Sequence, residues 1–76
     1  MNFSNPNFPQ IIWSFTYRGW QLEVEQSEED GQVLYAVWAN HDAGCAVAVP
    51  CAFTREDAIK RAKKYVDARL QIPIEI

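Results

Sequence analysis

The amino-acid sequence predicts an α+β fold, in which three or four antiparallel strands form a meander that packs against one C-terminal helix. Apolar and polar residues alternate between Ile12 and Val24, which is the period of a strand with one buried face. Asp30-Gly31 indicates a hairpin turn between two apolar runs. From Thr54 to Leu70 the apolar residues recur with the period of an amphipathic helix.

The first apolar run changes parity along its length. The large apolar residues are at odd positions up to residue 17 and at even positions from residue 20: Trp13, Phe15, Tyr17, Trp20, Leu22 and Val24. Arg18-Gly19 lies at the change, and glycine readily takes the positive φ that a tight turn requires. The pattern predicts either a hairpin or one bulged strand at Arg18-Gly19.

Two further strands are expected before the helix. The run Val33–Ala39 is apolar at odd and even positions alike, which is typical of a central strand. A turn at Asn40–Gly44 leads into Cys45–Phe53, whose odd-numbered residues are expected on one side of the sheet. Pro50 cannot donate a main-chain hydrogen bond, so this last run is predicted to be an edge or bulged strand.

The helix is predicted from its first residue onward. Thr54 and Asp57 have the spacing of a capping box, with a hydroxyl N-cap and a carboxylate three residues later. The apolar stripe expected to face the core consists of Ala58, Ile59, Ala62, Tyr65, Val66 and Leu70. We expect an irregular arm over residues 1–10, a single domain over 11–71 and an extended apolar tail over 72–76.

Size and charge limit the classes of function. A chain of 76 residues holds one small core, and chains this short often gain stability by association. No apolar run is long enough to span a bilayer and no secretory leader is recognisable, which favours the cytoplasm. The net charge is −3, so nucleic acid is an unlikely partner on electrostatic grounds.

No motif indicates a catalytic or metal centre. Cys45 and Cys51 lie too far apart along one predicted strand to form a disulfide, and we expect both to be reduced core thiols. Together with His41 and Asp42 they are the only conceivable metal ligands, at spacings unlike those of zinc sites. A cysteine with His41 could form a thiol nucleophile and its base, but no third group that would orient the imidazole is recognisable. We therefore expect no enzyme activity, no metal and no cofactor.

The aromatic content predicts a contact surface. One helix covers only one sheet face, yet the strands supply large apolar groups for two. The face away from the helix is expected to carry the partner contact and to be lined by some of Trp13, Phe15, Tyr17, Leu34 and Trp38. Two alternatives stay open. Either the N-terminal arm and the Ile72–Ile76 tail cover this face, or it meets a protein partner or a second copy in a homodimer.

A basic helix face is the second candidate surface. It consists of Lys60, Arg61, Lys63 and Lys64. Three four-apart pairs are expected to neutralise part of it: Glu56 with Lys60, Asp57 with Arg61, and Lys63 with Asp67. The face is therefore predicted to be mainly a solvated one.

The stretch from Asp30 to Leu70 resembles the HicB-like antitoxin fold. The matching pieces are Asp30-Gly31, the strand through Tyr35 and Val37, Gly44-Cys45, and Thr54-Arg55-Glu56-Asp57-Ala58. This resemblance implies hairpins followed by a helix, and neutralisation of a toxin as one function. Tyr17-Arg18-Gly19-Trp20 is similar to the opening hairpin of small uncharacterised bacterial and phage proteins, which implies no activity.

The leading functional expectation is a non-catalytic protein-interaction or regulatory accessory protein. A HicB-like antitoxin and a nucleic-acid-binding module that uses the basic helix face are the alternatives. A toxin nuclease encoded next to this chain would favour the antitoxin, and salt-sensitive retention of RNA or DNA would favour the nucleic-acid-binding module.

Overall fold

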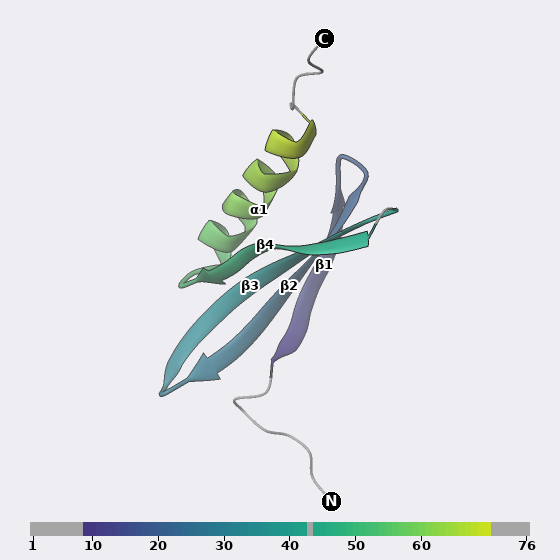
Figure 1. The fold of residues 1–76 in the computed structure, drawn as a ribbon. Helices are drawn as coiled ribbons and strands as arrows, with labels where there is room; N and C mark the ends of the chain where they lie inside the picture. The colour runs from purple at the N-terminus through teal and green to yellow at the C-terminus, as the bar shows by residue number, and fades with distance from the viewer. Residues whose placement is uncertain (1–8, 43, 71–76) are drawn as a thin grey trace, which may run out of the picture.

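The computed structural model describes residues 9–42 and 44–70, which form a four-stranded antiparallel sheet followed by one helix (Figure 1). The elements are β1 Gln10–Tyr17, β2 Trp20–Glu29, β3 Gln32–His41, β4 Gly44–Ala52 and α1 Arg55–Leu70. Each strand pairs with the next one in the chain. The predicted α+β meander is confirmed. Most of the predicted arm and all of the 72–76 tail lie outside the described residues, while Gln10 already belongs to β1.

The first two connections are two-residue hairpin turns. Arg18 and Gly19 have φ values of 52° and 87°, and Asp30 and Gly31 have 53° and 77°. Positive φ at both central residues is the requirement of a type I′ turn, whose twist matches that of the flanking strands. Arg18-Gly19 is therefore a hairpin turn rather than a bulge within one strand. The matched twist also lets β2 and β3 continue their pairing as far as Glu29 and Gln32, next to the second turn. Both strands therefore extend beyond the ends that the sequence predicts.

β4 is an edge strand with two irregularities in its pairing to β3. The register shifts between Tyr35 and Val37 and again between Val37 and Trp38, as the proline in this strand suggested. Val49 pairs with Val37, whereas Val47 pairs with Trp38. The two β4 valines therefore lie on opposite faces, and the expectation that all odd residues of β4 share a side was wrong. An extra bulge residue inverts the alternation that follows it.

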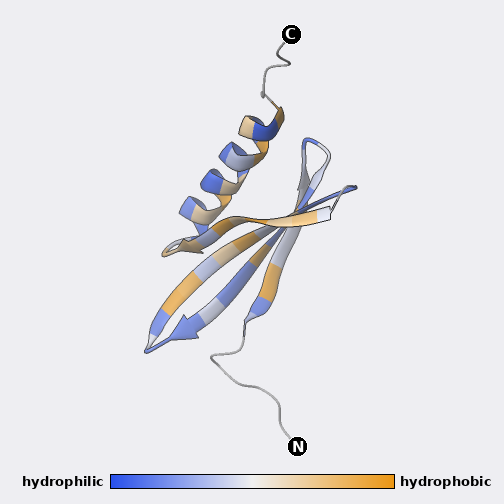
Figure 2. Cartoon of the chain, viewed as in Figure 1, coloured by the Kyte–Doolittle hydropathy of each residue, from blue (hydrophilic) through white to orange (hydrophobic). Residues whose placement is uncertain are grey.

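The core lies between α1 and one face of the sheet. Its fully buried members are Leu22, Val24, Val37, Ala39, Val49, Ala52, Ala58, Ala62 and Val66. The helix contributes residues spaced four apart, which form a straight ridge on one side of it. The helix packs mainly over β4 and β3 and less over β2, and Figure 1 shows α1 beside β4. Figure 2 shows apolar colour along nearly all of β4 and alternating bands on the inner strands.

The helix begins and ends near the predicted residues. The Asp57 amide donates to Thr54 Oγ1 at 3.1 Å, and the Ala58 amide donates to the Thr54 carbonyl at 3.0 Å. These bonds satisfy donors that the first helical turn leaves without partners. Leu70 was expected in the core stripe but is 46% exposed, because the last turn extends past the sheet residues that cover the ridge. No helix in residues 9–42 and 44–70 has the length and apolar character to cross a membrane.

Truncation of Leu22 tests this core. Leu22→Ala removes a side chain that is 0% exposed, and such a cavity costs about 2–5 kcal/mol of unfolding free energy. Leu70→Ala makes the same chemical change at an exposed position, where we expect about 0.5 kcal/mol or less. Urea titration monitored by circular dichroism measures both. Equal losses for the two variants would contradict the core assignment.

Candidate functional site

The residues predicted to form one contact surface lie on two faces of the sheet. Phe15 pairs with Leu22, and directly opposite residues of an antiparallel pair share a face. Because Leu22 is buried against α1, the three β1 aromatic residues lie on the helix side. Trp38 pairs with Glu23, whose position in β2 alternates with that of Leu22, so Trp38 lies on the opposite face. Leu34 shares the face of Trp38. Of the five candidates for the face away from the helix, Leu34 and Trp38 therefore lie on it, and the three β1 aromatic residues do not.

The sheet face away from α1, called the open face below, is half apolar and half polar. Its apolar half lies over β3 and β4 and contains Leu34, Ala36, Trp38 and Val47. Of these, Val47 is 43% exposed and the others are half-buried. The described part of the chain places no helix or loop over them. A solvated face of an antiparallel sheet is normally polar, so this patch is unusual for a surface that meets only water.

The polar half of the open face is acidic beside the tryptophan. Glu23 and Glu25 of β2 are the direct neighbours of Trp38 and Ala36. The Trp38 indole Nε1 donates to Glu25 Oε1 at 2.9 Å, which joins the indole to the acidic half of the face. Toward the β1 edge, the open face carries hydroxyl and amide side chains. The side-chain amide of Gln21 in β2 donates there to Ser14 Oγ in β1. The open face thus presents an apolar patch with an aromatic ring and a carboxylate border.

The aromatic side chains of β1 form a separate cluster beside the helix. The rings of Trp13 and Phe15 lie 5.0 Å apart between centroids. Trp13 is 46% exposed, and the preceding Ile11 and Ile12 are 50% and 37% exposed. α1 packs over the same face but mainly above β3 and β4, toward the opposite edge of the sheet, so β1 receives little cover from it. Phe15 and Tyr17 nevertheless pack against the edge of the core.

A polar cluster ties the first hairpin to the helix. The Arg18 Nη1 group donates to Asp67 Oδ1 at 2.7 Å, and the Tyr17 hydroxyl donates to the same oxygen at 2.9 Å. The Arg18 guanidinium is the largest cause that lowers the pKa of Asp67 below its ordinary value. The hydrogen bond from the Tyr17 hydroxyl is the second cause. The hydrogen bond to Asp67 in turn raises the pKa of Tyr17. Hydrogen bonds to the charged form of a carboxyl favour that form.

Part of the basic helix face is engaged within the chain. Arg61 Nη1 lies 3.3 Å from Asp57 Oδ2 and also donates to the Cys51 carbonyl at 3.0 Å. The Lys63 Nζ atom lies 5.4 Å from the centroid of the Tyr17 ring. The expected Asp57–Arg61 pair is confirmed. Asp67 bonds to Arg18 instead of Lys63, and the ion pairs of the described residues do not include Glu56 with Lys60.

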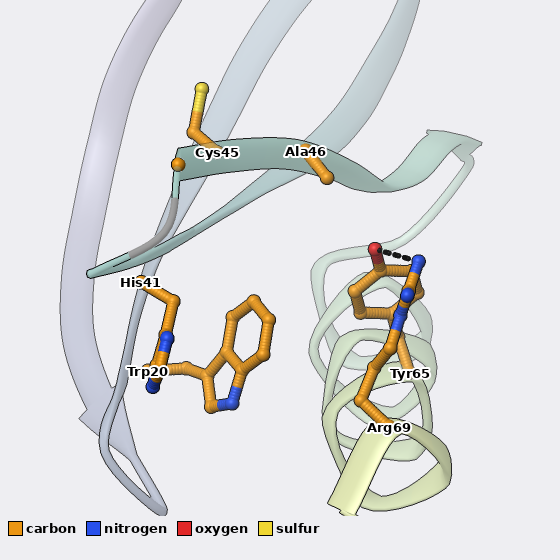
Figure 3. A pocket seen from close by; sticks show the side chains of 7 residues that line it. Trp20, His41, Cys45, Ala46, Tyr65 and Arg69 are labelled. Atoms are coloured by element: carbon orange, nitrogen blue, oxygen red, sulfur yellow. Dashed lines mark hydrogen bonds between the residues drawn. The ribbon is translucent and has the colours of Figure 1, made fainter. Parts of the chain in front are cut away.

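A pocket of about 270 Å³ opens between the β3–β4 end of the sheet and the last turns of α1 (Figure 3). The Trp20 ring lies 4.6 Å from the His41 ring and edge-on to Tyr65 at 6.4 Å. Arg69 Nη2 donates to the Tyr65 hydroxyl at 2.7 Å. The Trp20 Nε1 group is buried without a hydrogen-bond partner among the described residues. No local sequence pattern links Trp20 to Arg69 across the fold, so this pocket was not predicted from the sequence.

The two residues of a conceivable thiol nucleophile do not meet. Cys45 pairs with Asn40 and His41 pairs with Gly44, so the thiol and the imidazole lie on opposite faces. Figure 3 shows the sulfur pointing away from His41. Both cysteines are free, but they are exposed rather than buried in the core as expected, because Cys45 lies on the open face and Cys51 follows the proline of the irregular β4. Within the described residues, no three metal-ligating side chains cluster.

Comparison with known proteins returned no matching family model, no matching curated protein and no matching solved structure. The resemblance to HicB-like antitoxins therefore stays a prediction.

The polar cluster makes stability depend on pH in acid. Because the folded-state pKa of Asp67 is lowered, its stabilising effect is present above the unfolded-state pKa of about 3.9 and is lost as the pH falls through the folded-state pKa. We expect Asp67→Asn to be less stable than the wild type at neutral pH, by a margin that shrinks in strong acid. Urea titrations across the acid range measure this margin.

Arg18→Gln is the companion variant for Asp67. It removes the largest cause of the lowered pKa, so NMR titration of the Asp67 carboxyl carbon should show the pKa moving back toward its ordinary value. A stability margin independent of pH, or an Asp67 pKa that Arg18→Gln leaves unchanged, would contradict the assigned cluster.

Proposed function

We propose that this chain is a non-catalytic protein-interaction module that binds a protein partner through the apolar half of its open face. The observation that carries the proposal is the patch of Leu34, Ala36, Trp38 and Val47 opposite the helix, over which residues 9–42 and 44–70 place no helix or loop. An exposed apolar patch with a polar border is a mark of an interaction site. Tryptophan is also among the residues that most often dominate binding energy at protein interfaces.

The carboxylate border indicates the chemistry of the partner. Glu23 and Glu25 lie directly beside the patch, so a surface with apolar side chains next to lysine or arginine would complement it. Charge complementarity of this kind mainly increases the association rate and the specificity, and it weakens in salt. A toxin neutralised by this chain would be one such partner, so the HicB-like alternative concerns the identity of the partner rather than another surface.

The other classes of function receive less support. Binding of nucleic acid would need the basic helix face, but Arg61 is paired with Asp57 and Lys63 lies over Tyr17. Thiol catalysis would need Cys45 and His41 to meet, and the sheet separates them. The pocket at Trp20 offers aromatic and cationic groups but no paired nucleophile and base among its lining residues.

Site-specific cross-linking tests the proposal. A benzophenone amino acid at Val47 lies on the open face, and one at Lys60 on α1 serves as the matched control. In native extract we expect a saturable protein adduct from position 47 alone. Trp38→Ala should abolish the adduct while preserving the circular dichroism spectrum, and added salt should weaken it.

Two results would contradict this proposal. One is an adduct from position 47 that Trp38→Ala leaves unchanged. The other is an adduct confined to position 60 and sensitive to nuclease, which would support the nucleic-acid alternative instead.

A further inference from the structure

The two edges of the sheet differ in how well they are protected against pairing with another strand. β4 contains Pro50 and two register shifts, and these are devices by which edge strands avoid association. β1 contains neither a proline nor a charged residue in Gln10–Tyr17. Its single register shift lies between Ile11 and Trp13, so the segment from Trp13 to Tyr17 is regular. β1 therefore presents a regular, uncharged edge.

The hairpin turn determines which main-chain groups of β1 face outward. Tyr17 and Trp20 close the two-residue turn, and the closing pair of such a hairpin exchanges both of its hydrogen bonds. Hydrogen-bonded and non-hydrogen-bonded positions then alternate along the strand. The amide and carbonyl groups of Tyr17, Phe15 and Trp13 thus point toward β2. Those of Ser14 and Thr16 point away from the sheet.

We propose that β1 pairs in antiparallel fashion with β1 of a second copy of this chain, about a two-fold axis at Phe15. In this register Ser14 of one copy is opposite Thr16 of the other, so all the outward main-chain groups of the regular segment find partners. The bulge at Ile12 lies outside the paired segment. The two sheets become one continuous sheet of eight strands.

The side chains of β1 complement themselves in this register. On the helix side, Phe15 lies opposite Phe15 of the second copy, and Trp13 lies opposite Tyr17. Aromatic pairs of this kind stabilise neighbouring strands. On the open face, the Ser14 hydroxyl is beside the Thr16 hydroxyl. Trp13, which is 46% exposed in the single chain, then gains an apolar neighbour.

The charge distribution allows two identical chains to meet here in spite of their net negative charge. The acidic residues nearest to β1 on the open face, Glu23 and Glu25, belong to β2. The two β2 strands would lie about 14 Å apart, at about 4.8 Å for each strand spacing. This exceeds the Debye length of about 8 Å at physiological ionic strength. The helices pack mainly over β3 and β4, and their Asp67 and Lys63 side chains reach the paired segment at Tyr17.

This inference does not rest on the proposed function, because it uses the β1 edge and leaves Leu34, Trp38 and Val47 accessible. Sedimentation equilibrium of the full chain should therefore give twice the monomer mass of 8.7 kDa for both the wild type and Trp38→Ala. A wild type that remains monomeric at millimolar concentration would overturn the proposal.

Thr16→Pro tests the register of the hydrogen bonds. It removes an amide hydrogen that points away from β2, so the bonds within one chain are kept, while each copy loses one bond to the other. We expect the dissociation constant of the dimer to rise by about tenfold or more. Thr16→Val, which keeps the amide, is the control. A dimer that Thr16→Pro leaves unchanged, although the variant is folded, would overturn the proposal.

Cysteine cross-linking decides the question even if the proline variant fails to fold. In a background with Cys45→Ser and Cys51→Ser, Phe15→Cys places two thiols at the two-fold axis, where the Cα atoms are about 4.5 Å apart and a disulfide fits. Ser14→Cys is the control, because its two copies would be about 8 Å apart. Rapid oxidation of Phe15→Cys alone is the expected result. Equal oxidation of both variants, or of neither, would overturn the register.

Discussion

The packing of a single ridge of small helical residues against one sheet face determines the rest of this structure. Ala58, Ala62 and Val66 are fully buried, and their small side chains let α1 lie close to the sheet. Because the connection from β4 to α1 is short, the helix folds back over β4 and β3. One helix is narrower than a sheet of four strands, so among the described residues β1 receives little helical cover and the open face receives none.

The hairpin of β1 and β2 depends on a polar contact where apolar packing is thin. Asp67 receives hydrogen bonds from Arg18 and Tyr17, and these groups are 49 and 50 residues away along the chain. Exposed ion pairs contribute little stability, so this cluster orients the hairpin more than it stabilises the fold. It also holds the end of the strand whose outer edge we propose as a junction between copies.

The sequence was sufficient to predict the strands, the turns and the helix, but not which side chains lie on which face of the sheet. Turn chemistry at Arg18-Gly19 and Asp30-Gly31 and the cap at Thr54 are local, and each was located correctly. The error concerning Trp13 was avoidable, because a two-residue turn pairs it with Val24 and so assigns it to the side of the core. The number of bulges in β4 could not be predicted, because it depends on how β4 pairs with β3. The pocket around Trp20 depends on a tertiary contact with Tyr65, which no local pattern reports.

In this structure one face of the sheet is buried under α1 across β2, β3 and β4, and the opposite face is open to contact. NMR relaxation of methyl groups by a soluble paramagnetic chelate measures this directly, with monomeric protein. The account predicts strong enhancement for Leu34 and Val47, which lie on the open face, and little for Val37 and Val49, which are 0% exposed. Protection of Leu34 and Val47 equal to that of Val37 would contradict the account, because another part of the same chain would then cover the proposed contact surface.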